Sequence, residues 1–153
     1  MIRVENVSKS FGSKKALHQI SFEIQEDEIF GFLGPSGSGK TTMINVLTGQ
    51  LAADQGETVL LGKSSQALTS NDLEQIGIVS DNSGFYEKMS LYKNLLIYAK
   101  LYGLKASRVD TVLDQVGLSD AKNLIAEKLS TGMKQRMFLA RALLNAPKIL
   151  FLD

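Results

Sequence analysis

The first residues of the chain alternate between apolar and polar side chains. Ile2 and Val4 are separated by a charged residue, and Ile20, Phe22 and Ile24 are separated by polar ones. A period of two predicts β-strands that bury one face. We therefore expect the chain to begin with strands, each packed on one side only.

A continuous apolar run, IFGFL at 29–33, follows a polar turn at 26–28. Such a run predicts a strand that is covered on both faces. Beyond it, apolar residues at helical spacing predict a helix over 41–51. Shorter apolar runs at 58–61 and 76–79 predict two further strands.

The second half of the chain has the pattern of helices. Ser90 precedes apolar positions at spacings of three and four, which predicts a helix that Ser90 caps and Gly103 ends. Ser107 and Asp110 resemble a capping pair for a second helix over 108–116.

A last helix is expected over 131–145, because the AlaPro pair at 146–147 cannot continue it. The residues at 149–152 then predict a final strand. This order of elements predicts an α/β fold with a helical subdomain between about 83 and 145.

Composition limits the classes of function. The chain has 153 residues, of which 44% are hydrophobic and 22% are charged, as in one globular domain. A net charge of +1 provides no strong field for nucleic acid, so we expect no nucleic-acid partner. There is no cysteine, no apolar run near the roughly 20 residues that span a bilayer, and no apolar stretch of a secretory signal at the N-terminus. These features favour a cytosolic chain or subunit.

The stretch GPSGSGKT at 34–41 fits the phosphate-binding pattern G-x-x-x-x-G-K-[ST] between a predicted strand and a predicted helix. Glycine at 37 and 39 lets the backbone adopt positive φ and approach phosphate oxygens closely. Successive N–H groups at a helix N-terminus then attract an anion. The alternative is a flexible Gly/Ser turn.

Lys40 is placed to reach the β- and γ-phosphates and to act in catalysis, and the Thr41 hydroxyl is placed to ligate Mg²⁺. The predicted phosphate-binding residues are Gly34, Pro35, Ser36, Gly37, Ser38, Gly39, Lys40, Thr41 and Thr42. Phosphate binding alone does not separate kinases, GTPases, motor ATPases and transport ATPases.

Four other stretches occur in order around this loop: SKSFG at 8–12, IGIVSD at 76–81, LSTGMKQR at 129–136, and ARALLNAPKILFLD at 140–153. With the phosphate loop, they make nearly the whole chain resemble the ATP-binding subunit of ABC transporters. The resemblance implies a P-loop nucleoside triphosphate hydrolase fold with an N-terminal antiparallel β part and a helical signature subdomain. It also implies ATP and Mg²⁺ as ligands.

LSTGMKQR resembles the LSGGQ signature of that family. The resemblance implies that Ser130 and Gly132 contact the γ-phosphate of ATP held by a second copy, in a head-to-tail dimer. Ser130 as a simple helix cap is the alternative. Thr131, a small polar residue, stands where the family usually has Gly, and Met133 stands where it usually has Gln, which removes a hydrogen-bonding amide.

Asp81 stands where the family has a glutamine that reaches Mg²⁺ and the attacking water. We expect a catalytic, metal-proximal carboxylate or an Asx turn at this position, and both can hold. Phe85 and Tyr86 follow in the loop that, in the family, meets the coupling helix of the membrane subunit; local core is the alternative.

The resemblance also implies that Phe11 stacks on adenine, whereas a strand-end Phe can equally be core. His18 is expected at the surface. Lys9, Lys14 and Lys15 are expected to form a solvated edge.

Asp153 matches the Walker B aspartate, which holds Mg²⁺ at the end of a buried strand. In the family the next residue is a glutamate that polarises the attacking water, and a switch histidine follows later. A chain that ends at Asp153 is therefore expected to be an interrupted protein that hydrolyses ATP poorly. It is also expected to be poorly stable alone or to pair with another chain, because a missing family strand would leave unpaired backbone and exposed apolar edges.

The expected division is a partial ATP-binding domain over 1–153: a β part with the P-loop core at 1–82, a helical subdomain at 83–145 and the Walker B strand at 146–153. The C-terminal remainder of that domain is expected to be absent. The intact protein is expected to be an ATPase that drives transport through a separate membrane permease, with peptide or antibiotic export as the favoured solute class. It would lie in the cytoplasm, on the inner face of the membrane. The alternatives are a soluble ABC-type ATPase without a transport role, or an ATP-binding fragment without turnover.

Overall fold

The computed structural model describes residues 1–80 and 84–153. The chain divides into two compact units, Met1–Leu73 and Glu74–Asp153, which are taken one at a time. In the described part of the chain, no helix has both the length and the apolar character needed to cross a membrane.

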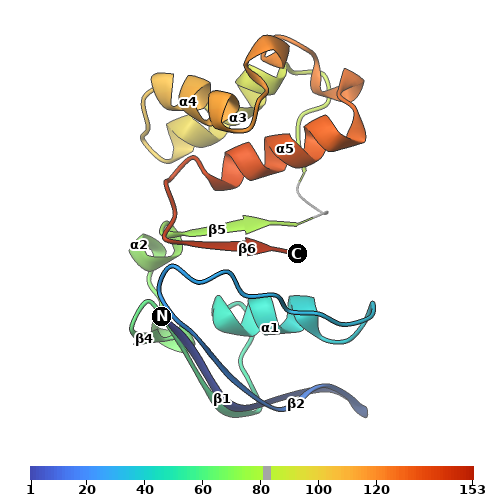
Figure 1. The fold of residues 1–153 in the computed structure, drawn as a ribbon, viewed down its shortest axis with the longest axis vertical. Helices are drawn as coiled ribbons and strands as arrows, with labels where there is room; N and C mark the ends of the chain where they lie inside the picture. Colours follow the sequence, from blue (N-terminus) through green and yellow to red (C-terminus); the bar gives the residue numbers. More distant parts are fainter. Residues whose placement is uncertain (81–83) are drawn as a thin grey trace. The chain divides into compact units, whose positions relative to one another are not determined.

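The first unit is a twisted antiparallel sheet with one main helix (Figure 1). Its elements are β1 Ile2–Phe11, β2 Lys14–Ile24, α1 Lys40–Leu47, β3 Gln55–Leu60, β4 Lys63–Ser64, the 3-10 turn η1 Ser65–Ala67 and the short helix α2 Ser70–Leu73. The strand order is β2-β1-β3-β4, and Ile2 pairs with Ile24 on one side and Leu60 on the other.

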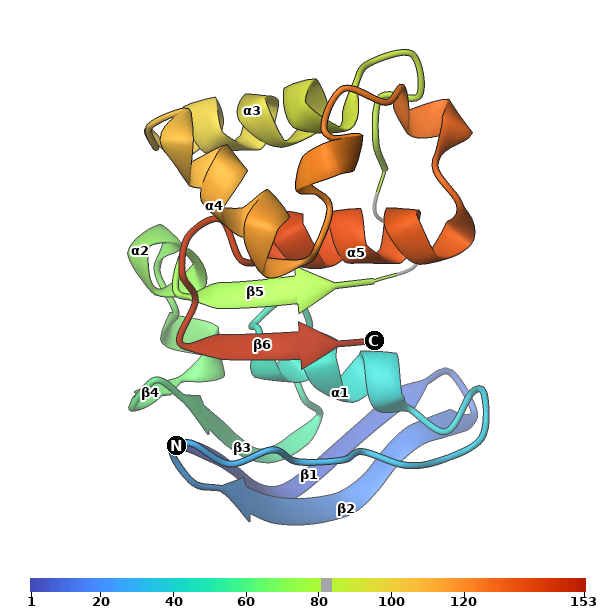
Figure 2. The ribbon, with the colours of Figure 1, turned by 45° about the horizontal axis from the view of Figure 1, so that its top comes forward.

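The predicted period of two is confirmed. Ile2 and Val4 are buried on β1 between exposed Arg3 and Glu5, so one face of the strand lies in the core. Met43, Val46 and Leu47 of α1 are also buried in this unit, and α1 contacts β2 and β3 of the sheet (Figure 2). Helix α1 ends four residues before its predicted end at 51, where the chain turns through Gly49 at φ +72°.

The prediction of a strand buried on both faces at IFGFL is wrong. The segment is not part of either sheet. Phe30 and Phe32 pack on Phe22 of β2, with ring centroids 5.1 and 5.7 Å from it, while Ile29 and Leu33 are 101% and 95% exposed. The segment therefore contacts β2 through its two aromatic rings, yet Phe30 and Phe32 still keep exposed fractions of 41% and 36%.

The second unit joins a two-stranded parallel sheet to a helical cluster. Its elements are β5 Ile76–Val79, α3 Leu91–Leu101, α4 Ser107–Gln115, the 3-10 turns η2 Ser119–Ala121 and η3 Ala126–Lys128, α5 Thr131–Ala142 and β6 Ile149–Leu152. Helix α5 lies between β5 and the pair α3 and α4 (Figure 2). A single apolar cluster fills the space among the helices, from Leu91 to Leu144 along the chain.

The strands predicted at 76–79 and 149–152 are confirmed as β5 and β6, paired in register from Ile76 with Ile149 to Val79 with Leu152. Ser90 caps α3 as predicted, since its hydroxyl accepts a hydrogen bond from the Lys93 N–H at 3.2 Å.

The capping pair predicted at Ser107 is wrong. Ala106 occupies the N-cap position of α4, with helical φ and ψ of −56° and −32°. No side chain caps this end of the helix. The Arg108 N–H donates to the Lys105 carbonyl at 3.0 Å, so the chain enters this helix through a backbone turn. Ser107 is therefore inside the helix, where a capping hydroxyl has no role.

Candidate functional site

The predicted phosphate loop closes around the side chain of Lys40. Its ammonium donates to the carbonyl oxygens of Gly34 and Pro35, both at 2.9 Å, and lies 3.5 Å from the Ser38 hydroxyl. The Ser38 N–H donates to the Pro35 carbonyl at 3.2 Å. The loop thus curls back on the lysine at the start of α1, with the positive charge inside the curl.

Two glycines make this curl sterically possible. Gly37 and Gly39 have φ of +79° and +96°, a region that residues with a Cβ rarely adopt. A Cβ on Gly39 would also lie 2.4 Å from the Ala16 carbonyl oxygen and 2.9 Å from Leu17 Cδ2. Glycine at this position therefore allows the loop to pack closely against β2 at the start of α1.

The resulting arrangement suits an anion. The first N–H groups of a helix have no partner within the helix, and the helix dipole makes that end positive. At α1 these groups lie beside the Lys40 ammonium, and Thr41 is exposed in the first turn. Together they provide backbone donors, a cation and a hydroxyl for phosphate oxygens and a hard cation.

Phe11 ends β1 and is 52% exposed, so it is not part of the core. Lys9, expected on a solvated edge, is instead largely covered: its side chain is 14% exposed and its ammonium lies over the Phe11 ring, 5.8 Å from the centroid. His18 is exposed, as predicted.

Ser130 caps α5. Its hydroxyl accepts from the Met133 N–H at 3.3 Å, in the same geometry that Ser90 has on α3. Ser130, Thr131 and Gly132 are all exposed, so this helix N-terminus is open to a ligand. The capping role is thus present, and contact with a second nucleotide stays a prediction.

Asp153 directly follows β6, and its N–H donates to the Val79 carbonyl at 2.9 Å. The pairing of β5 with β6 therefore places Asp153 at the carboxyl end of both strands. Asp81 lies outside the described residues. No group of three or more His, Cys, Asp or Glu side chains suited to a metal occurs within 1–80 and 84–153.

Two polar residues that the sequence analysis missed hold the loop at 84–90. The buried Asn94 amide accepts from the Tyr86 N–H at 2.7 Å and donates to the carbonyls of Tyr86 and Ser90, both at 3.0 Å. Arg141 donates to the Gly84 carbonyl at 3.0 Å and stacks on Tyr98. The only sequence signal for Asn94 is an amide directly before Leu95 on an otherwise apolar helix face.

The two loop aromatics have different environments. Phe85 is half-buried and packs on Phe138, with 5.9 Å between ring centroids, whereas Tyr86 is 56% exposed. Local core therefore accounts for Phe85, and Tyr86 is available at the surface.

Comparison with known proteins agrees with this geometry. The family model described as ABC transporter matches residues 17–153. The bacitracin transport ATP-binding protein BcrA of Bacillus licheniformis is 36% identical over 154 residues, which cover 100% of this chain and 50% of that protein. The lantibiotic transport ATP-binding protein SrtF of Streptococcus pyogenes is 30% identical over 153 residues, which cover 100% of this chain and 66% of that protein.

A solved ATP-binding cassette of an ABC transporter in its ADP conformation superposes with a TM-score of 0.84 at 27% identity, over 97% of this chain and 66% of that one. This confirms the predicted P-loop nucleoside triphosphate hydrolase fold. The chain spans about half the length of the first curated relatives that it matches. The chain therefore belongs to the ABC transporter family, as an ATP-binding domain of that family.

Proposed function

We propose that this chain binds ATP with Mg²⁺ and that, in the whole protein, ATP hydrolysis drives transport through a separate membrane permease. The observation that carries the proposal is the loop around Lys40. One exposed site at the start of α1 combines the Lys40 ammonium with Gly39, a position where any residue with a Cβ would clash with β2. Such a place suits the triphosphate of a nucleotide.

Each predicted residue has a role in this proposal. The backbone of Gly34 to Thr42 and the Lys40 ammonium hold the phosphates, and Phe11 offers its exposed ring to the adenine. Mg²⁺ keeps several waters and takes few protein ligands besides phosphate oxygens. The Thr41 hydroxyl and the Asp153 carboxylate are hard oxygen donors of this kind, so they fit the ion although the described part of the chain holds no dense acidic cluster. Mg²⁺ would neutralise the charge that develops on the transferred phosphoryl group.

The first test is calorimetric titration of Mg-ATP into the protein beside Lys40→Ala. Lys88→Ala is the matched control, because the Lys88 side chain is 81% exposed and pairs with Glu127 within the second unit, whereas Lys40 belongs to the first. We expect saturable binding that is lost only in Lys40→Ala. Binding that survives in Lys40→Ala, or that Lys88→Ala removes equally, would contradict the phosphate-loop assignment.

We further propose that two copies bind ATP head to tail, with Ser130 and Gly132 of one copy on the γ-phosphate held by the other. Ser130 and Ser90 offer a matched pair, since both hydroxyls cap a helix in the same way. Each Ser→Ala change should cost about 1 kcal/mol in unfolding free energy. Only Ser130→Ala should weaken ATP-dependent dimerisation, measured by sedimentation. Equal weakening by both variants would mean that Ser130 acts only as a helix cap.

The permease is the proposed membrane partner, which would place the protein on the cytoplasmic face of the membrane. The relatives named for bacitracin and lantibiotic transport favour export as the direction and peptides or antibiotics as the solute class. Tyr86 is the proposed contact, because Asn94 and Arg141 hold its loop while leaving its ring exposed.

Co-purification with the cognate permease tests this partner, with Tyr86→Ala against Tyr102→Ala, whose side chain is 46% exposed. Loss of the complex in Tyr86→Ala alone supports the proposal. If the protein hydrolyses ATP but never co-purifies with a membrane subunit, a soluble ABC-type ATPase is favoured instead. Asp81 keeps its proposed role near the metal, which Asp81→Asn would test through the Mg²⁺ dependence of turnover.

A further inference from the structure

The ring of Phe11 is covered on one face and open elsewhere. The Lys9 ammonium lies over the ring, 5.8 Å from its centroid, because residues two apart on a strand share a face. The Phe11 side chain still keeps an exposed fraction of 52%. The surface of the ring that Lys9 leaves uncovered therefore faces solvent, at the very end of β1.

Asp54 holds Lys9 in this position. One carboxylate oxygen of Asp54 accepts from the Lys9 ammonium at 2.7 Å, and the other accepts from the Ser10 N–H at 2.7 Å. The Asp54 N–H in turn donates to the Ser8 carbonyl at 2.9 Å. Because Asp54 precedes β3, its side chain continues the hydrogen bonding of β1 beyond the last residue that β3 itself pairs, which is Ser8.

The ion pair is better held than an ordinary surface pair. The Lys9 side chain is 14% exposed, and its ammonium has the ring on one side and the carboxylate on another. The Lys9 hydrogen bond, and after it the Ser10 N–H, keep the pKa of the Asp54 carboxyl below its usual range. The Asp54 carboxylate thus accepts from both Lys9 and Ser10, and Lys9 cannot move off the ring without losing its hydrogen bond to Asp54.

We propose that Lys9 and Asp54 are positioning residues that fix Phe11, so that its uncovered face takes the nucleotide base. This inference rests on the proposed ATP binding. The physical reason is that an exposed ring at the end of a strand is otherwise free to rotate, and binding a base then carries the entropy cost of ordering the ring. A ring already held by a cation on one face and a clamped backbone loses less freedom when a base stacks on the other.

The test compares two ligands of the same loop: Mg-ATP, which has a base, and Mg-tripolyphosphate, which has none. Stacking of a base on an aromatic side chain is worth roughly 5- to 150-fold in affinity. We expect Phe11→Ala to show such a loss for Mg-ATP. Lys9→Met and Asp54→Asn should each weaken Mg-ATP by roughly 3- to 10-fold, a part of that stacking effect, and should leave tripolyphosphate unchanged.

Three controls make the result specific. Lys9→Arg should restore wild-type affinity, because Arg keeps both the ion pair and the stacking on the ring. Lys14→Met removes an exposed lysine of the same hairpin and should change neither ligand. Lys9→Met should have no further effect in a Phe11→Ala background, since the ring through which it acts is gone.

Equal weakening of Mg-ATP and tripolyphosphate by Lys9→Met would overturn the proposal, because Lys9 would then act on phosphate charge or on folding. Unchanged Mg-ATP affinity in both Lys9→Met and Asp54→Asn would also overturn it. Asp54→Asn keeps the size of the side chain, so it decides the question if Lys9→Met does not fold. If the unaltered protein does not bind Mg-ATP through Lys40, the proposed function fails, and this inference fails with it.

Discussion

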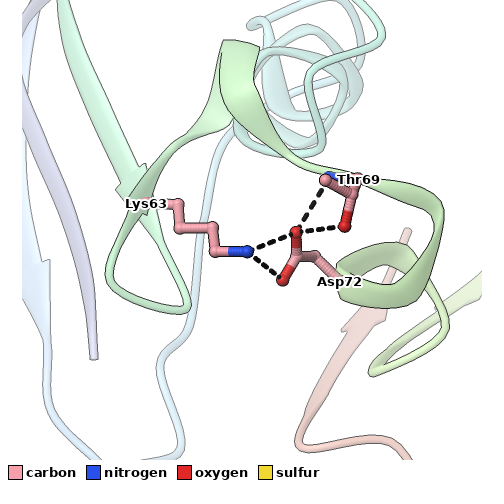
Figure 3. Close-up of polar contacts among 3 residues, drawn as sticks. All are labelled: Lys63, Thr69 and Asp72. Atoms are coloured by element: carbon pink, nitrogen blue, oxygen red, sulfur yellow. Dashed lines mark hydrogen bonds and ion pairs between the residues drawn. The ribbon is translucent and has the colours of Figure 1, made fainter.

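The ammonium of Lys63 on β4 lies 2.8 Å from both carboxylate oxygens of Asp72 on α2 (Figure 3). Thr69 donates to the same carboxylate through its N–H at 2.8 Å and its hydroxyl at 2.6 Å. Asp72 is 7% exposed, so these four bonds satisfy an acid that is nearly buried. They tie the short helix α2 to the sheet of the first unit.

This carboxylate predicts an acid-sensitive contribution to stability. The bonds from Lys63 and then from Thr69 hold the pKa of Asp72 well below its usual range. The unfolded chain therefore takes up the proton first, and stability falls as the pH drops below about 4 toward the folded pKa. We expect the urea midpoint to fall between pH 5 and pH 3, and to fall less steeply in Asp72→Asn.

Asp120→Asn is the control for that series, because Asp120 is an exposed acid on η2. It should reproduce the pH dependence of the unaltered protein. If the urea midpoint of Asp72→Asn fell with pH as steeply as that of Asp120→Asn, Asp72 would not be the source of the acid-sensitive stability.

The phosphate loop predicts unequal costs for two glycine substitutions. Gly37→Ala meets only the strain of positive φ, since a Cβ there has nothing within 4 Å, and should cost about 1–2 kcal/mol. Gly39→Ala adds a clash with the Ala16 carbonyl oxygen and should cost about 3 kcal/mol or more. Unfolding in urea measures both, and equal costs would mean that β2 does not press on the loop.

The buried amide of Asn94 predicts a loop that loosens on truncation. Asn94→Ala would leave the Tyr86 N–H without the Asn94 acceptor, while the Tyr86 and Ser90 carbonyls keep their backbone donors. The expected cost in unfolding free energy is about 1–3 kcal/mol. Chymotrypsin should then cleave faster at Phe85 and Tyr86. Asn123→Ala, at an exposed position, should change stability by less than about 0.5 kcal/mol and leave the cleavage rate as it was.

Substitution of Gly132 should change the stability of the protein and its dimerisation in opposite directions. Gly132 lies in the first turn of α5 without positive φ, and a Cβ there has nothing within 4 Å. Gly132→Ala should therefore raise the unfolding free energy by about 0.5 kcal/mol through helix propensity. Under the proposed dimer it should still weaken ATP-dependent dimerisation, measured by sedimentation. A more stable protein with unchanged dimerisation would remove Gly132 from the nucleotide contacts.

The sequence alone determined the features that depend on near neighbours. The alternation at Ile2 and Val4, the cap at Ser90 and the strand at 149–152 are set by residues within a few positions, and the structure confirms each. The backbone of the predicted phosphate loop is also local, because Gly37, Gly39 and Lys40 occur within one short stretch and the positive φ predicted there is present. Phosphate binding by this loop stays a prediction.

Only the tertiary structure decided which side chains are covered and by what. The apolar run at 29–33 has the pattern of a buried strand, yet all five residues are exposed, and only the rings of Phe30 and Phe32 contact Phe22. Asp54 meets Lys9 from 45 positions away. Burial and ion pairing depend on contacts between distant parts of the chain, and a local pattern of apolar and polar residues does not contain that information.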